Sequence, residues 1–432
     1  NLSHGQLICN QDHRFLAAEQ LRQLFDQQQD TTELKLVPQV DIVLEPCGRN
    51  TTPAVLVAAL RLQAMGNDHP MLLLAADHAI ADHQAFHQAL LKAHSLAELG
   101  YLVTLGIQPT FPCTGYGYIQ TDPELGQGYG VAQFVEKPTE SVATQYLTSG
   151  NYLWNSGMFI ARPSILLAEA EKYCPELKHQ CQLVVEQSYA DLDFVRLPEE
   201  VFVKCEDISI DYAIMEHTNI AAVVPMDCGW SDVGDLAALK QANPEDNNGN
   251  MIFGDVQTFE TKNCLIHSSH KLVSTLGVDN LAIVDTKDAL LVANLDQSQQ
   301  VKELVKQLQS RDELTHHREV YRPWGSYDSV ENRPNYQVKR ITVNPSAKLS
   351  LQRHQFRAEH WVVVEGTATV YLDGVEHTLA TNESIYIPKM AVHSLANHTQ
   401  KPLHLIEVQS GSYLGEDDIE RLEDIYGRET NE

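Results

Sequence analysis

Positive charge is scarce in this chain of 432 residues. Lys and Arg total 31 against 58 Asp and Glu, which gives a formal net charge of −27. Such an excess of negative charge repels nucleic acids and anionic membrane surfaces, so we expect neither as a general partner. Any phosphate-binding site in this chain is therefore a local exception.

Long apolar runs and cysteine pairs are also missing. No run approaches the ~20 apolar residues of a membrane-spanning helix, and no basic-then-apolar leader opens the sequence. The eight cysteines form no Cys-x-x-Cys pair and none lies beyond Cys264, which argues against a disulfide framework or a zinc finger. We expect a cytoplasmic protein with reduced thiols, and the sequence leaves open whether it forms a homo-oligomer.

The pattern along the chain predicts three parts. Up to residue 245, short β-rich runs alternate with helical stretches, which indicates an α/β domain with a mostly parallel sheet. Residues 246–310 form a β-rich linker segment with a loose, solenoid-like repeat that ends in a helix. Residues 318–428 consist of short strands and turns, which favour a small antiparallel barrel. We expect the acidic tail beyond residue 415 to be helical.

The segment EPCGRNTTPAV at 45–55 lies between a predicted strand and a predicted helix. We expect Thr51 or Thr52 to cap that helix, with Pro53 at its first position. The free backbone N–H groups there suit an anion or a base edge, and the alternative is a well-capped loop with a solvated Arg49. The candidate substrate-binding residues of this loop are Arg49, Asn50 and Thr51.

Two aspartates follow predicted strands at distant points of the chain. Asp77 ends the run LLLAAD, and Asp232 lies in GWSDVGD after the strand AAVVPMD. Because strand ends can share one edge of a sheet, we expect the two carboxylates to meet and hold Mg²⁺ beside reacting phosphates. The alternative for Asp77 is that it caps the next helix.

A third set of residues suits a phosphorylated sugar. Gly117 and Gly157 permit a close approach of the backbone, and Glu136 and Asn155 can hydrogen-bond hydroxyl groups. Lys137 can meet a phosphate. Each motif is weak by itself, because a Glu-Lys-Pro sequence is more often a turn, but their order after successive strands predicts a sugar-phosphate pocket.

Together these motifs resemble the bifunctional bacterial enzymes that join a mannose-1-phosphate guanylyltransferase to a cupin-type mannose-6-phosphate isomerase. The resemblance implies a sugar-nucleotide transferase fold that uses GTP, mannose 1-phosphate and Mg²⁺, with Asp77, Lys137 and Asp232 as catalytic residues. It also implies a metal-bearing barrel that acts on mannose 6-phosphate, and a role in GDP-mannose and polysaccharide precursor synthesis. The motifs run from the first residues to about residue 428: EPCGRNTTPA, AADH, TGYGYI, FVEKP, NSGMF, SIDYAIME, GWSDVG, RPWGSYDSV, YQVKRITV, LSLQRH, RAEHW, YIPKMAVH and EVQSGSYLGEDDIERLEDIYGR.

The resemblance also implies a metal site in the barrel, for Zn²⁺ or another divalent ion. Regular strand alternation places His354, Phe356 and His360 on one face, so Phe356 falls in a ligand position. We expect His354, His360 and His393 as ligands, with Glu359 as the alternative if a bulge redirects it. Otherwise these imidazoles are ordinary barrel or surface residues.

Two further features of the barrel stand out. Met390 replaces the glycine that is usual in the second cupin motif. Lys339, Arg340 and Arg421 are candidates for contact with the substrate phosphate, although a solvated strand face and an ion pair explain them equally well.

The glycine-rich signature that opens the transferase half of the family is missing before Asn10. We expect a truncated chain rather than a natural short form, with two unpaired strand edges and low stability. The alternative to an active enzyme is an impaired relic or sugar-phosphate-binding module. A transferase for another hexose 1-phosphate is a third hypothesis.

Overall fold

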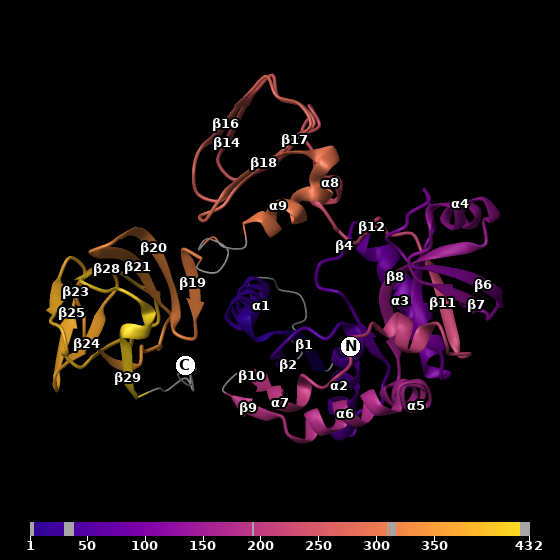
Figure 1. Ribbon diagram of the computed structural model, residues 1–432, viewed down its shortest axis with the longest axis horizontal. Coiled ribbons are helices and arrows are strands. Elements are labelled where there is room, and N and C mark those ends of the chain that lie inside the picture. The colour runs from indigo at the N-terminus through magenta and orange to yellow at the C-terminus, as the bar shows by residue number, and fades with distance from the viewer. Residues whose placement is uncertain (1–3, 30–38, 192–193, 309–310, 312–316, 424–432) are drawn as a thin grey trace.

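The computed structural model describes the chain except residues 1–3, 30–38, 192–193, 309–310, 312–316 and 424–432. Its elements fall into three parts, shown in Figure 1 as a layered α/β part, a β-helical part above it and a yellow-orange barrel to one side. Within the described residues, the structure contains no helix that could span a membrane.

The first part contains two sheets covered by helices. A four-stranded sheet has the order β1-β2-β10-β9 and a six-stranded sheet has the order β3-β8-β5-β11-β7-β6. The strands are β1 His4–Asn10, β2 Gln39–Glu45, β3 Met71–Leu73, β4 Ala79–Ile80, β5 Leu102–Ile107, β6 Tyr118–Glu124, β7 Tyr129–Val135, β8 Tyr152–Ala161, β9 Tyr189–Asp191, β10 Phe194–Arg196, β11 Ala221–Met226 and β12 Trp230–Ser231. The helices are α1 Arg14–Gln29, α2 Thr51–Ala64, α3 His83–Glu98, α4 Glu140–Ser149, α5 Pro163–Tyr173, α6 Pro175–Glu186, α7 Glu199–Phe202 and α8 Leu236–Gln241.

The α/β fold is confirmed, but its larger sheet is mixed rather than mostly parallel. β5 and β11 pair in parallel, whereas β8 runs antiparallel to β3, β5 and β6. The sequence NSGMF, which suggested only a glycine-containing motif, lies within β8. The interpretation of alternating strands and helices therefore missed the strand that reverses the pairing.

Each of the two sheets ends on a strand with one open edge. In the described part of the chain β1 is the outer strand of the smaller sheet and β3 that of the larger sheet, and no strand pairing joins them. The expected exposure of two unpaired edges by a missing strand and the predicted low stability both stay predictions.

The helix that follows β2 begins differently from the prediction. Asn50, at φ 60°, is the N-cap of α2, and its side-chain oxygen accepts a hydrogen bond from the Thr51 N–H at 3.0 Å. Thr51 is the first helical residue, so Pro53 is the third rather than the first. The Thr51 hydroxyl instead accepts a hydrogen bond from the N–H of Ile210 at 3.0 Å, which ties α2 to a distant loop.

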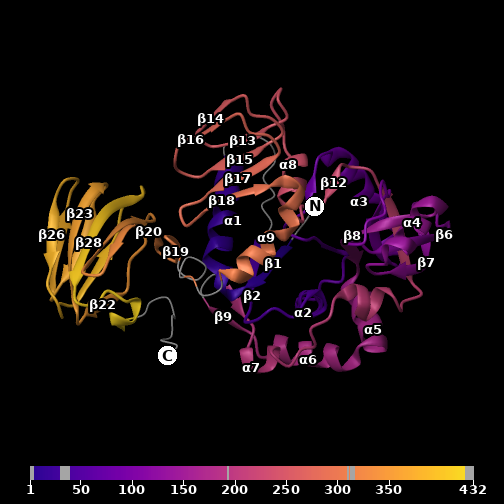
Figure 2. The same ribbon diagram turned by 45° about the horizontal axis from the view of Figure 1, so that its top comes forward.

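The second part is a short parallel β-helix. β13, β15 and β17 stack in parallel, as do β14 and β16, and β18 closes the longer sheet antiparallel to β17. Figure 2 shows these rungs above the first part. The elements are β13 Met251–Phe253, β14 Val256–Phe259, β15 Leu265–Ser268, β16 Val273–Leu276, β17 Leu281–Asp285, β18 Leu290–Asn294 and α9 Val301–Gln307. The helix predicted at the end of this segment is present as α9.

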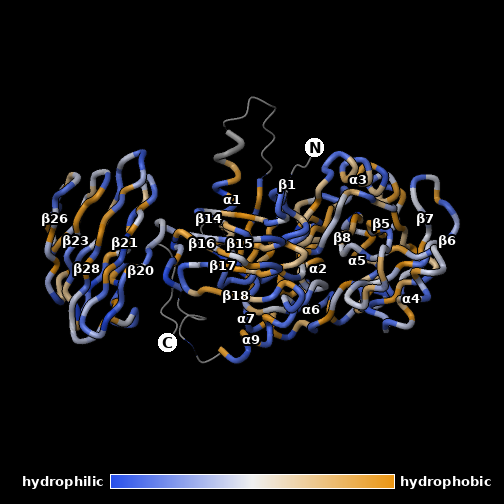
Figure 3. Tube along the Cα trace, turned by 90° about the horizontal axis from the view of Figure 1, so that it is seen from above, coloured by the Kyte–Doolittle hydropathy of each residue, from blue (hydrophilic) through white to orange (hydrophobic). Residues whose placement is uncertain are grey.

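The third part is a barrel of two facing sheets. One has the order β19-β20-β21-β28-β23-β26 and the other β25-β24-β27-β22-β29. Figure 3 shows apolar residues along the strands of this part. The strands are β19 Glu319–Arg322, β20 Gly325–Arg333, β21 Tyr336–Val343, β22 Leu351–His354, β23 Arg357–Glu365, β24 Ala368–Leu372, β25 Val375–Leu379, β26 Ser384–Ile387, β27 His393–Ala396, β28 Leu403–Gly411 and β29 Ile419–Glu423.

The acidic tail is not a helix where the structure describes it. Glu416–Asp418 form a single 3-10 turn, and β29 then pairs with β22. Pairing with an open strand edge therefore outweighs the helical propensity of this segment.

The buried apolar clusters follow the three parts. Separate clusters fill the α/β part and the barrel. Leu236, Ala237 and Leu239 of α8 pack against Leu265 of the β-helix. We propose the predicted division at 1–245, 246–310 and 318–428 with one refinement, that α8 packs with the second domain.

Candidate functional site

The segments that carry Asp77 and Asp232 lie side by side. β4 pairs antiparallel with β12, with Ile80 opposite Trp230 and Ala79 opposite Ser231. Asp77 and Asp232 therefore leave this short ladder at the same end, and both carboxylates act electrostatically on the pKa of His78. The structure thus brings together the two aspartates that lie far apart in the sequence.

The surroundings of the two aspartates differ. Asp77 is exposed in a turn, and α3 is capped instead by Asp82, which accepts hydrogen bonds from two backbone N–H groups at 2.9 Å. Asp77 is therefore not the cap of the next helix. Asp232 is half-buried and accepts a hydrogen bond of 2.8 Å from the Tyr116 hydroxyl, a partner that sequence reasoning missed.

His78, which follows Asp77, contacts Trp230 of β12. Its Nδ1 accepts a hydrogen bond of 3.3 Å from the indole N–H of Trp230, and burial lowers its pKa against the opposing effect of Asp77 and Asp232. Gly157 lies next to it, because a Cβ at that position would lie 3.8 Å from His78 Cε1. Gly157 also adopts φ +71°, which favours glycine.

Gly117, Glu136 and Asn155 form one compact group. A Cβ at residue 117 would clash with Glu136 Oε2 and lie 3.3 Å from the Asn155 Cβ. Glu136 Oε2 is buried without a hydrogen-bond partner among the described residues. A buried acceptor without a partner is unfavourable, so this carboxylate is available to a ligand hydroxyl.

Two charged neighbours, Asp211 and the adjacent Lys137, set the electrostatic surroundings of Glu136. Burial raises the pKa of Glu136, and the nearby Asp211 raises it further. Lys137 Nζ lies 3.1 Å from Glu136 Oε1, and this hydrogen bond raises the pKa of Lys137. Lys137 adopts a left-handed φ of 46° and its side chain is exposed, so it can reach a ligand.

Asn155 is fixed by a buried network that sequence reasoning only partly found. Its Oδ1 accepts from the Thr104 hydroxyl at 3.0 Å, and its Nδ2 donates to Asp211 Oδ1 at 2.8 Å. Burial raises the pKa of Asp211. The motif SIDYAIME contains Asp211, but no spacing in the sequence pointed to its contact with Asn155.

The loop after β2 is not simply solvated. Arg49 Nη2 donates a 2.5 Å hydrogen bond to the carbonyl of Val203, while its Nε is buried without a hydrogen-bond partner in the described part of the chain. Burial raises the pKa of Glu45 to about 7. Sequence reasoning did not single out Glu45, although it begins the EPCGRN motif.

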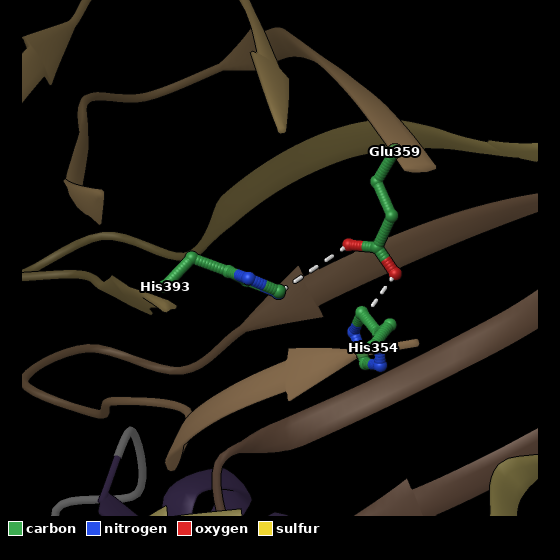
Figure 4. A group of neighbouring side chains, drawn as sticks. All are labelled: His354, Glu359 and His393. Carbon is green, nitrogen blue, oxygen red and sulfur yellow. Dashed lines mark ion pairs between the residues drawn. The ribbon is translucent and has the colours of Figure 1, made fainter. Parts of the chain in front are cut away.

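The barrel contains a second, fully buried group of side chains. Glu359 Oε1 lies 3.2 Å from His354 Nε2, and Glu359 Oε2 lies 3.6 Å from His393 Nε2 (Figure 4). One ligand atom from each residue lies within 4.8 Å of the others, which suits a single metal ion. Burial alone would raise the pKa of Glu359, but the close contact with His354 and the charges of His393 and Arg357 lower it to about 2.

The backbone sets the orientation of one imidazole. His393 Nδ1 lies 2.9 Å from the carbonyl of Ala391, and this contact suits an N–H donor at Nδ1. Its Nε2 is then a free lone pair, and both this atom and the ring nitrogens of His354 lack a hydrogen-bond partner among the described residues. Such orphaned nitrogens around a carboxylate fit a metal site with an open position.

His360 and Phe356 do not belong to this group. His360 is exposed and lies against Tyr386, with ring centroids 4.7 Å apart. Residues 355 and 356 form a turn between β22 and β23, so strand alternation restarts with Glu359 inward and His360 outward. The structure therefore places Glu359, the alternative, in the group that could hold a metal and leaves His360 outside it, and Phe356 is 42% exposed.

The turn that causes this change is held by the tail. The N–H groups of Gln355 and Phe356 both donate to Asp418 Oδ1, at 3.0 and 3.3 Å. Met390, in the position usual for glycine, adopts φ 65° and donates its N–H to the carbonyl of His354 at 2.7 Å. The left-handed backbone is thus kept although the glycine is not.

The comparisons with known proteins agree with this architecture. Residues 3–249 match the nucleotidyl transferase family model, 254–308 match the mannose-phosphate isomerase/GMP-like beta-helix domain, and 309–424 match the mannose-6-phosphate isomerase C-terminal domain. Alginate biosynthesis protein AlgA of Pseudomonas aeruginosa is 49% identical over 427 residues, which cover 98% of this chain and 86% of that protein. The chain belongs to the bifunctional mannose-1-phosphate guanylyltransferase family.

Two further relatives support the family assignment. A mannose-1-phosphate guanylyltransferase of Escherichia coli K12 is 49% identical over 98% of this chain and 88% of its own length. A crystal structure described as mannose-1-phosphate geranyltransferase from Thermus thermophilus is 31% identical and superimposes with a TM-score of 0.59, over 70% of this chain and 84% of that one. The resemblance and the predicted fold class are therefore confirmed.

Proposed function

We propose that the first part of the chain transfers the guanylyl group of GTP to mannose 1-phosphate. A phosphate oxygen of mannose 1-phosphate bonds to the α-phosphorus of GTP, the bond from that phosphorus to the bridging oxygen breaks, and pyrophosphate leaves. The observation that carries the proposal is the β4–β12 ladder, which sets Asp77 and Asp232 at one end beside Gly157.

A divalent cation is part of this proposal, and Asp77 and Asp232 would hold it. Mg²⁺ takes one or two protein carboxylates and completes its shell with water and substrate phosphates, so these residues fit its chemistry. When bound it neutralises charge on the reacting phosphates. Tyr116 orients the Asp232 carboxylate by its hydrogen bond.

The sugar is held by the group around Gly117. The unpartnered Glu136 Oε2 accepts from a sugar hydroxyl, and Asn155 is preoriented by Thr104 and Asp211. Lys137 attracts the phosphate. The sugar hydroxyls that Glu136 and Asn155 contact determine whether the site selects mannose 1-phosphate or another hexose 1-phosphate.

The barrel is proposed to interconvert mannose 6-phosphate and fructose 6-phosphate. His354, Glu359 and His393 would hold Zn²⁺ or another divalent ion, which polarises the sugar carbonyl when bound. These buried residues would orient the open-chain sugar and exclude water while one proton moves from C2 to C1 and the hydroxyl proton of O2 moves to O1, which converts the aldose into the ketose. The eight free thiols suit the cytoplasm, where we place this enzyme.

The test measures pyrophosphate release with Mg²⁺ present, for GTP against ATP, UTP and CTP, and with several hexose 1-phosphates. The proposal predicts that GTP with mannose 1-phosphate gives the fastest turnover, and that Lys137→Gln raises KM for the sugar phosphate. Binding of mannose 1-phosphate without any release of pyrophosphate would support an impaired relic instead. A faster reaction with another hexose 1-phosphate would support the third hypothesis.

A further inference from the structure

The barrel cavity beside Glu359 gathers cations in an acidic chain. The cavity has a volume of about 510 Å³ including its open mouth, and its charged lining consists of four cations, Arg322, Lys339, Arg357 and Arg421, and three carboxylates, Glu359, Glu407 and Glu416. The formal charge of the whole chain is −27, whereas cations outnumber carboxylates at this cavity, which is a local reversal. Such a reversal is expected where an anion binds.

Two of these cations converge on one aromatic ring. Lys339 Nζ lies 4.5 Å from the centroid of Tyr327, and Arg322 Cζ lies 5.5 Å from the same centroid. The ring lowers the cost of placing two like charges together. An anion between Lys339 and Arg322 would relieve the remaining repulsion.

Arg421 completes the cluster from another strand. It lies on β29 opposite Gln352 of β22, and its Nε is buried without a hydrogen-bond partner in the described part of the chain. Arg357 is held at both ends of its guanidinium, because its Nη1 donates to the carbonyls of Leu414 and Gly415 and its Nε lies 3.5 Å from Glu359 Oε1. Arg322 Nη1 donates to the carbonyl of its neighbour Tyr321 at 3.3 Å, which engages one of its nitrogens. We therefore take Arg322, Lys339 and Arg421 as the cations that can meet a ligand.

One carboxylate already lies among them. Glu416 Oε1 is 2.7 Å from Lys339 Nζ and is carried by the short turn before β29. Burial lowers the pKa of Lys339, but Glu416, Glu407 and Tyr327 together outweigh burial and raise it, so Lys339 stays protonated. Glu416 thus both keeps Lys339 charged and competes with an incoming anion.

We propose that Arg322, Lys339 and Arg421 form the phosphate-binding end of the isomerase cavity. The phosphate of mannose 6-phosphate binds there, and the sugar carbonyl lies toward Glu359 and the two histidines at the other end. The inference rests on the proposed isomerase function, because it takes that substrate as the ligand. Arg340, which the sequence also suggested, is excluded since it is exposed on the outer side of β21.

The experiment compares Arg322→Gln and Arg421→Gln with the control Arg340→Gln in the full-length, metal-loaded protein. Loss of one charge-assisted hydrogen bond predicts a rise of about tenfold or more in KM for mannose 6-phosphate, with kcat and metal content little changed. Glu416→Gln should act in the opposite direction and lower KM, because it removes a competing negative charge. If the cluster has only a structural role, Arg322→Gln, Arg421→Gln and Glu416→Gln should all lower kcat, and none of them should lower KM. That result would contradict the proposal.

A binding measurement separates failure of this inference from failure of the isomerase proposal. Inorganic phosphate is titrated into each protein by calorimetry, with excess GDP-mannose present to occupy the transferase part. We expect binding to wild type and to Arg340→Gln, and binding at least about tenfold weaker to Arg322→Gln and Arg421→Gln. This result without isomerase activity would keep the phosphate site and reject the isomerase function. Equal phosphate affinity in all four proteins would overturn the inference.

Discussion

The transferase edge and the barrel cavity place their carboxylates in opposite environments. Asp77 is exposed in a turn, whereas Glu359 is 0% exposed between two histidines. An exposed carboxylate costs little to hold without a metal, while a buried one depends on the charges around it. From this comparison we infer that the first site is completed by its substrates and that the second is largely preformed by the fold.

The largest effect is expected at the transferase edge. Asp232→Asn should lower guanylyl transfer by about 10³-fold, because it removes charge that balances the cation beside the reacting phosphates. Isomerase activity in the same sample should not change. Asp82→Asn is the matched control, since asparagine caps a helix as well as aspartate does. Equal losses of both activities in Asp232→Asn would mean that the two sites are not separate.

The next effect sharpens the account of the barrel site. Glu359→Gln should weaken Zn²⁺ binding by at least about 100-fold, beyond the 10–100-fold loss typical of a change next to a ligand. His360→Gln should bind Zn²⁺ as wild type does, because His360 points outward against Tyr386. Metal analysis after equilibrium dialysis checks both variants. If His360→Gln loses the metal and Glu359→Gln keeps it, the assigned ligands are wrong.

A smaller effect concerns the pH dependence of the transferase part. Burial raises the pKa of Glu45 to about 7, so its destabilising contribution grows as pH rises from about 4.5 to 7 and then levels off. Glu45→Gln removes this contribution and should stabilise the protein by about 1 kcal/mol near pH 7.5, with the effect reduced by partial solvation. At pH 4.5 the two proteins should unfold alike. Thermal unfolding at both pH values measures the stability difference between Glu45→Gln and wild type. An equal stabilisation at both pH values would argue against the raised pKa of Glu45.

The last effect, no larger than the one at Glu45, is expected at Met390 near His393. Met390 has φ 65°, a left-handed conformation that costs a non-glycine residue about 1 kcal/mol. Met390→Gly should therefore raise the stability of the barrel by about that amount without changing metal affinity. Lys389→Gly is the control, because glycine there only adds flexibility and should destabilise. Chemical denaturation followed by Trp fluorescence measures the stability of both variants. If Met390→Gly is destabilised, the left-handed φ of Met390 does not cost the barrel stability.

The parts of the fold that the sequence predicted are those with strong local patterns. The apolar helix α2 and the buried strands β5 and β11 lie where periodicity placed them, and the two strand-end aspartates lie on adjacent segments. Strand β8 was missed because a motif with two polar residues and a glycine hides its extended backbone. Local patterns cannot show which distant strand a segment pairs with.

The barrel site shows a second limit of sequence reasoning. Counting alternate residues from His354 selected Phe356 and His360, since nothing in the local sequence marks the two-residue turn. That turn is held by Asp418, which accepts its hydrogen bonds and lies more than sixty residues away in the sequence. The sequence around residues 355 and 356 therefore does not reveal the turn. The same is true of Asp211 beside Asn155, and of Tyr116 beside Asp232.

The central claim is that one chain carries two separate metal-dependent sites, one completed by substrate and one preformed. Its most direct test removes all metal with a chelator, dialyses the protein, restores Mg²⁺ alone and measures both activities in one sample. The account predicts that guanylyl transfer returns with Mg²⁺ and that isomerase activity returns only when a divalent ion, Zn²⁺ or another, occupies the barrel. Isomerase activity in a protein whose barrel is shown by metal analysis to hold no ion at all would contradict it.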